Sequence, residues 1–150
     1  MINLFIAATR ETWESNPTIF YKDRALTEYI QPEFKAKYGT FSPEAIAAIK
    51  KMPCLFACED CEHQDVYIGY ITDISVRSNN IKIGYRLTGD YIRFDVFQTM
   101  EDILDMGPWE HYRTHWTIKD VELSEMEPYF AKENGKGEPK SAPSKGAVTP

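Results

Sequence analysis

Apolar and polar residues alternate most regularly between residues 66 and 87, and this pattern predicts a β-hairpin. A period of two residues is typical of a strand that buries one of its faces. Every second residue from 68 to 76 lies on one face, and Ile81, Ile83, Tyr85 and Leu87 resume the pattern. Asn tolerates the left-handed backbone of a type I′ turn, so we expect Asn79-Asn80 to form the turn and fix the register.

Four further segments have the composition of strands. Each is short, apolar or alternating, and bounded by polar or turn-forming residues. They cover residues 3–9, 54–58, 91–97 and 114–123. Residues 13–21 are interrupted by Ser15-Asn16-Pro17, so we expect a loop there.

The best-defined helix follows Ser42, which is a good N-cap residue. Pro43 fits the first helical position because its missing N–H needs no partner there, and Pro53 ends the helical pattern. Residues 23–30 also have helical spacing, and Pro32 either ends that helix or opens a second helical turn over residues 32–39 that Gly39 closes. A last helix is predicted over residues 100–106, capped by Thr99 and stopped by Gly107-Pro108.

Together these elements predict an α+β domain over residues 1–130. Its sheet has about five strands and is mostly antiparallel, with about three short helices, and a small curled barrel is one form that such a sheet takes. Residues 131–150 contain few large apolar side chains. We expect them to be a disordered tail, because burial cannot offset the entropy lost on ordering them.

Composition and charge restrict the classes of partner. The formal net charge is −6 at pH 7, and an acidic chain does not attract the phosphate backbone, so we expect no nucleic-acid binding. No apolar run reaches the roughly 20 residues that span a bilayer, so we expect no membrane contact. Three cysteines do not form a disulfide framework, and the first residues lack a secretory layout. We therefore expect a cytoplasmic protein.

Cys54, Cys58, Cys61 and His63 lie close together in the sequence. The C-x3-C-x2-C spacing is that of cluster-binding loops in radical SAM enzymes, but the antiparallel pattern disagrees with their partial βα barrel. Four N and S ligands would complete a tetrahedral zinc site, although structural zinc sites usually combine two separated pairs. The simplest interpretation is two core cysteines followed by a polar loop. We therefore expect no cofactor, with zinc as the alternative.

A second set of candidate residues lies on the last predicted strand: Arg113, His115, Trp116, Lys119 and Asp120. On a strand, His115 and Lys119 project to one side and Trp116 to the other. Arginine, histidine and lysine side chains together bind phosphate or carboxylate groups. The same side chains are also compatible with an ordinary charged strand face exposed to solvent.

Two strings of this sequence resemble a bacterial accessory module found in or beside antiphage effector proteins. GYITDISVRSNNIKIGYRL is similar to the module's hairpin, and RTHWTIKDVEL to its late strand of the form RTHWAxKDVDL. The resemblance covers about residues 53–123. It implies an accessory role and draws attention to the charged residues of the second string, without implying a catalytic residue or including the cysteines.

The chain contains no P-loop, no G-x-S-x-G and no G-x-G-x-x-G after a strand. We therefore expect a non-enzymatic interaction or regulatory domain that binds another protein, with exposed aromatic residues such as Tyr67 or Trp109 as anchors. The alternative is a sensor that binds a small anionic ligand or nucleotide through Arg113, His115 and Lys119. A third interpretation is a small zinc-binding module.

Overall fold

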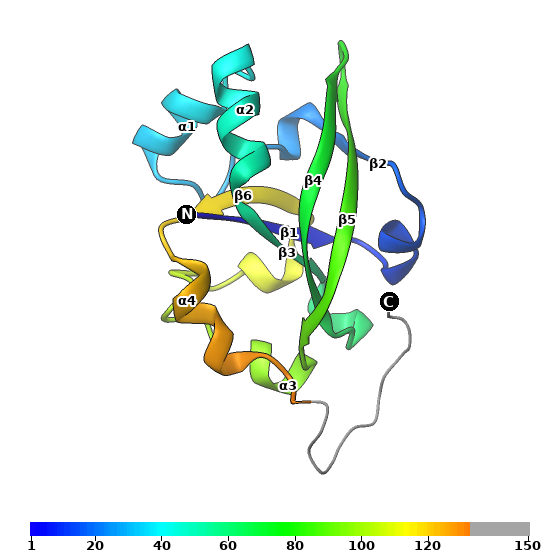
Figure 1. Ribbon diagram of the computed structural model, residues 1–150, viewed down its shortest axis with the longest axis vertical. Helices are drawn as coiled ribbons and strands as arrows, with labels where there is room; N and C mark the ends of the chain where they lie inside the picture. The colour runs from blue at the N-terminus through cyan, green and yellow to red at the C-terminus, as the bar shows by residue number, and fades with distance from the viewer. Residues whose placement is uncertain (133–150) are drawn as a thin grey trace.

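The chain folds around one six-stranded β-sheet in a computed structural model that describes residues 1–132 (Figure 1). The strands are β1 (Ile2–Ala7), β2 (Thr18–Tyr21), β3 (Pro53–Cys58), β4 (Val66–Val76), β5 (Asn80–Ile92) and β6 (His115–Lys119). Their order across the sheet is β2-β5-β4-β3-β1-β6. The β1 and β3 strands are parallel, whereas the other neighbouring pairs are antiparallel. The predicted α+β class is therefore confirmed.

Four short α-helices and five 3-10 turns complete the part of the chain that the structure describes. The helices are α1 (Pro32–Tyr38), α2 (Pro43–Lys51), α3 (Phe94–Phe97) and α4 (Leu123–Met126). The 3-10 turns are η1 (Arg10–Glu14), η2 (Lys22–Arg24), η3 (Asp60–Glu62), η4 (Glu110–Tyr112) and η5 (Glu127–Tyr129). Figure 1 shows α1 and α2 at one end of the molecule, α3 and α4 at the other, and the long β4–β5 hairpin running between them.

Alternation along β1 divides the apolar core into two clusters, one on each face of the sheet. Phe5 stacks on Trp116 of β6 and Phe56 of β3, with ring centroids 4.9 and 5.4 Å apart, and this cluster includes side chains of α1 and α2. Leu4 belongs to the opposite cluster, which includes Phe97 of α3 and the side chain at the end of α4. Because both faces are covered, every residue of β1 and β6 is buried, as in sheets packed on both sides.

The outer edge of β6 is covered by an irregular segment. The backbone N–H of Leu26 donates to the carbonyl of Trp116 at 2.8 Å, and the Thr117 hydroxyl donates to the carbonyl of Tyr29 at 2.8 Å. Leu26 and Tyr29 have positive φ angles of 59° and 57°. The predicted helix over residues 23–30 is therefore wrong, because left-handed residues interrupt the helix and their carbonyl and N–H groups bond to β6 instead.

The helix after Ser42 and the hairpin are both confirmed. Ser42 Oγ accepts a hydrogen bond from the Ala45 N–H at 3.1 Å, which caps α2. The hairpin turn, however, lies one residue earlier than predicted. Arg77 N–H donates to the Asn80 carbonyl at 2.8 Å, so Ser78 and Asn79 occupy the turn, and neither has the positive φ of a type I′ turn.

A β-bulge at Thr72 changes which residues share a face of the hairpin. Ile71 pairs with Tyr85 and Asp73 pairs with Gly84, so β4 has one extra residue between these pairs. Ile68 packs in the cluster beneath α3, whereas Ile71 and Ile74 pack in the opposite cluster. The prediction that residues 68 and 74 share one face is therefore wrong, since a single inserted residue reverses the alternation.

Three other predicted elements differ from the structure. Residues 13–21 contain β2 rather than only a loop, and the strand predicted over 91–97 ends at Ile92 and continues as α3. Residues 100–106 form successive turns instead of a helix, and Asp105 has a φ of 50°. Local spacing misleads here because contacts with the rest of the sheet select the backbone conformation.

The sheet does not close, so the predicted barrel is wrong: β2 and β6 lie at opposite edges and do not pair. The predicted disordered tail lies almost wholly outside the described residues. None of the helices within residues 1–132 is long and apolar enough to cross a bilayer.

Candidate functional site

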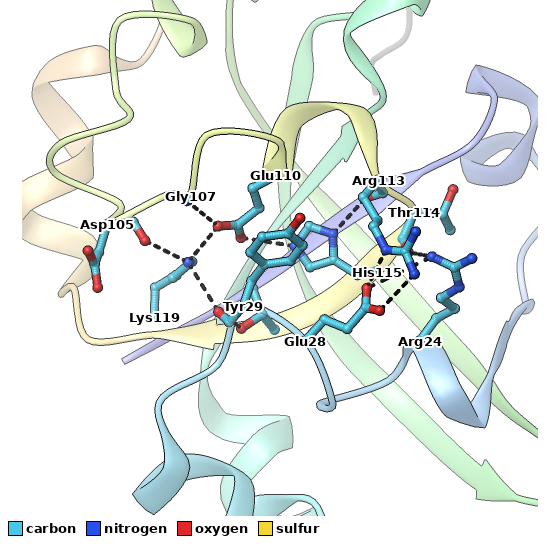
Figure 2. Close-up of polar contacts among 11 residues, drawn as sticks. Arg24, Glu28, Tyr29, Asp105, Gly107, Glu110, Arg113, Thr114, His115 and Lys119 are labelled. Atoms are coloured by element: carbon cyan, nitrogen blue, oxygen red, sulfur yellow. Dashed lines mark hydrogen bonds and ion pairs between the residues drawn. The ribbon is translucent and has the colours of Figure 1, made fainter.

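A buried charge cluster forms where η4 packs against β6 (Figure 2). It consists of Glu110 from η4 and His115 and Lys119 from β6, whose exposed fractions are 0%, 0% and 5%. Glu110 Oε1 lies 3.1 Å from Lys119 Nζ, and Glu110 Oε2 lies 2.9 Å from His115 Nε2. One carboxylate therefore lies between two side chains that carry positive charge when protonated.

Lys119 uses all three of its ammonium donors within this cluster. Besides Glu110, Nζ donates to the carbonyl of Asp105 at 3.0 Å and to the carbonyl of Tyr29 at 3.3 Å. Both carbonyls belong to residues with positive φ, at 50° and 57°. Left-handed backbone is costly for such residues and is retained where surrounding contacts determine it. The ammonium group thus ties three separate segments to β6.

The hydrogen bonds of His115 define where protons must lie. Its Nδ1 is 2.6 Å from the Arg113 carbonyl, which can only accept, so Nδ1 carries a proton. Its Nε2 faces the Glu110 carboxylate, and a proton between these two atoms satisfies both. The other carboxylate oxygen also accepts from the Gly107 N–H at 2.9 Å. Each polar atom of the cluster therefore has a partner.

Opposing effects act on the pKa of Glu110. Burial raises it, whereas the hydrogen bond with His115, the charge of Lys119 and the Gly107 N–H lower it. The lowering effects are stronger, so the pKa of Glu110 lies below its usual value of 4.5. Glu110 is consequently ionised at neutral pH, and the cluster is a buried ion pair extended by hydrogen bonds.

The residues predicted to bind an anion occupy different environments. His115 and Lys119 lie in the buried cluster, so β6 does not present them as a solvent-exposed face. Arg113 forms two hydrogen bonds with Glu28, at 2.7 and 2.8 Å, outside the cluster. Trp116 lies on the opposite face of the sheet, and Asp120 is exposed. The structure therefore brings two of the five together, and their binding of an anion stays a prediction.

Sequence reasoning missed Glu110, the residue that joins the two cluster members on β6. No motif marks it, because the sequence WEHY around it has no characteristic spacing. The one available signal was Lys119: a lysine on a strand that also carries core residues needs a counter-charge if it is buried. That signal indicates that a partner exists without identifying it.

A cavity of about 560 Å³ opens beside the cluster. Its walls come from residues 29–31, the turns at 103–107 and the chain after β6, residues 118–121. Glu110 and Lys119 also line it. Its volume falls within the range of small-molecule sites, which combine apolar walls with a few convergent polar groups.

The cysteine candidates lie apart from this cavity. Cys54 and Cys58 project into the core cluster that contains Trp116, and burial raises the pKa of each thiol to about 12. His63 packs its ring edge-on against Phe94 at 5.0 Å. The side chain of Cys61 lies outside what the structure describes. Among the described residues no three histidine, cysteine or acidic side chains converge as metal ligands, and zinc binding stays a prediction.

An exposed aromatic pair is presented by the same turn that carries Glu110. Trp109 and Tyr112 are 69% and 56% exposed, and their ring centroids lie 6.1 Å apart. Between them in the sequence, Glu110 and His111 are buried. We call Trp109 and Tyr112 the aromatic pair. Because these two buried residues lie between the two exposed ones, the contacts of Glu110 hold the aromatic pair at the surface.

Replacing Glu110 with Gln keeps the size of the side chain but removes its charge. Lys119 and His115 would then lack a buried counter-charge, so we expect the free energy of unfolding to fall by about 3–5 kcal/mol. Urea unfolding followed by circular dichroism measures this change. Glu28→Gln is the matched control, because it breaks the more exposed pair with Arg113 and should cost much less. Equal losses in the two variants would contradict a stabilising role for the cluster.

The stability that ionised Glu110 provides should depend on pH. Its pKa is lowered by folding, so the unfolded chain binds more protons as the pH falls below 4.5. The stabilisation is therefore present above this pH and is lost in more acidic solution. We expect the difference in unfolding free energy between the wild-type protein and Glu110→Gln to shrink from about pH 6 to about pH 3. A difference that stays constant over this range would show that Glu110 does not titrate as the structure implies.

Comparison with known proteins gave no match to a family model, to a curated protein or to a solved structure. The assignment of this site therefore depends on its geometry and chemistry. The resemblance to a bacterial accessory module stays a prediction.

Proposed function

We propose that this chain is a non-enzymatic interaction domain that binds another protein through the aromatic pair. The observation that supports this proposal is the exposure of Trp109 and Tyr112 on a turn whose intervening residues are buried. Tryptophan and tyrosine are enriched among the residues that dominate binding energy at interfaces. As the resemblance of residues 53–123 implies, the domain would act as an accessory part of a bacterial or phage-associated cytoplasmic protein.

The fixed backbone of the turn favours binding. Glu110 Oε1 accepts from the Gly107 N–H, and its two oxygens bond to β6, so the turn is held at several points. A surface that is already ordered loses less conformational entropy when a partner binds. Tyr67, the other predicted anchor, is half-buried, and its hydroxyl accepts a hydrogen bond from Gln64 at 3.0 Å. The aromatic pair is therefore the stronger candidate for the contact surface.

Removing one ring of the aromatic pair should abolish partner binding without unfolding the domain. We expect Trp109→Ala to reduce the amount of co-purified partner by about tenfold or more in a tagged pull-down from the native cell. Tyr21→Ala is the matched control, because Tyr21 is an aromatic residue with 68% exposure on β2. Retention of the partner by Trp109→Ala, or an equal loss in Tyr21→Ala, would contradict the proposed surface.

A second candidate function, the sensing of a small anionic ligand, is favoured by the cavity beside the charge cluster. When His115 is protonated, the positive charges of Lys119 and His115 exceed the single negative charge of Glu110, although Asp105 and Asp120 also line the cavity. A net positive charge at the buried side of a cavity favours an anion. In a sensor of this kind, Lys119 and His115 would attract the ligand through their charge. Their hydrogen-bond donors already have partners within the protein.

A thermal-shift screen against inorganic phosphate, nucleotides and small carboxylates tests this second candidate. A ligand at about 100 times its Kd should add about 2.7 kcal/mol to the stability of the folded protein. We expect the shift to disappear in Ile103→Trp, which fills the cavity, and to persist in Trp109→Ala, which is not among the cavity-lining residues. No shift with any compound in the panel would remove the sensor from consideration.

A further inference from the structure

The aromatic pair lies beside two acidic side chains from different segments. Asp60 belongs to η3, which contacts η4, and its charge acts on the pKa of Tyr112 at the end of η4. The side-chain amide of Gln98 donates to both oxygens of Asp60, at 3.2 and 3.3 Å, and so fixes its position. Glu101 Oε2 lies 3.1 Å from Nε2 of His111, although the two atoms lack hydrogen-bond geometry. Two aromatic rings and two carboxylates therefore share one surface.

The carboxylates of this surface act on the hydroxyl of Tyr112. The charge of Asp60 raises the pKa of Tyr112, and the charge of Glu101 acts in the same direction. Within residues 1–132, Asp60 takes part in no ion pair. Arg113 follows Tyr112 directly, but its guanidinium is held by Glu28 (Figure 2). The nearest cation in the sequence therefore does not neutralise the surface.

We propose that the aromatic pair, together with Asp60 and Glu101, binds an arginine or lysine side chain from a basic segment of the partner protein. This inference rests on the proposed interaction function and specifies the chemistry of the partner. Cations are attracted to the faces of tryptophan and tyrosine rings, and guanidinium groups also pair with carboxylates. Aromatic rings beside a carboxylate that forms no ion pair within residues 1–132 offer both interactions to one side chain.

The overall charge of the chain favours the same class of partner. With a net charge of −6, the protein attracts a basic segment at long range and repels an acidic one. Long-range attraction alone would act on any part of the surface. The specific part of the proposal is that the cation contacts the aromatic pair. Testing this part requires variants that remove the same charge at different places on the surface.

Fluorescence anisotropy with labelled peptides tests the proposal directly. The probes are an arginine-rich peptide, its lysine counterpart and a glutamate-rich peptide of equal length. We expect the two basic peptides to bind and Asp60→Asn to weaken them by about threefold, whereas Trp109→Ala weakens them by about fivefold or more. Asp73→Asn on β4 is the control, because Asp73 is exposed and its replacement removes the same charge from another element.

Tryptophan fluorescence gives a second readout that reports the contact itself. Trp13 and Trp116 are buried, so acrylamide quenches mainly the exposed Trp109. We expect saturating arginine-rich peptide to protect this fluorescence from acrylamide, and a thermal melt of each variant verifies that it remains folded. Binding without protection of Trp109 would overturn the proposal, because it would place the cation elsewhere on the acidic surface.

The outcomes separate this inference from the proposed function. If a natural partner depends on Trp109 but Asp60→Asn binds it as well as wild type does, the interaction surface stands and the basic partner is wrong. Equal effects of Asp60→Asn and Asp73→Asn would likewise attribute the binding of basic peptides to net charge alone. If neither a partner nor a peptide depends on Trp109, the proposed function itself fails.

Discussion

The arrangement of this protein around its candidate site depends on one buried carboxylate. Glu110 neutralises Lys119 and hydrogen-bonds to His115, and all three side chains are buried. Removing a charged group from water costs several kcal/mol, so each member of the cluster requires the others. Because Glu110 comes from η4 and the other two from β6, the requirement fixes the turn against the sheet.

The same requirement organises the segments around the cluster. The carbonyls of Tyr29 and Asp105 complete the coordination of the Lys119 ammonium, and both residues adopt left-handed backbone to do so. This arrangement covers the edge of β6 on one side and forms the wall of the cavity on the other. The hydrogen bonds that the buried lysine needs therefore both cover the edge of β6 and shape the cavity.

The position of the exposed aromatic pair depends on the buried charge cluster. A turn whose two middle residues are buried can present Trp109 and Tyr112 at the surface only if those middle residues are firmly held. The charge cluster provides that support through Glu110. The position of the proposed partner site thus depends on an interior ion pair.

Much of the fold could be predicted from local patterns in the sequence. Residues 66–87 specify a hairpin through a period of two, and Ser42-Pro43 specifies the start of α2 through capping. These features depend on neighbouring residues, which the sequence displays directly. The bulge at Thr72 could not be predicted from the sequence. A residue that has no partner on the neighbouring strand is of the same type as residues that have one, so the residue types of β4 do not mark it.

The sequence by itself determined that β6 carries His115 and Lys119 on the face opposite Trp116. Only the tertiary structure decided whether that face meets water or protein, because burial depends on what packs against it. It also decided that Glu110 supplies the counter-charge, although many acidic residues in this chain were equally available by type. Charge pairing acts through space between separate elements, and no periodicity records it.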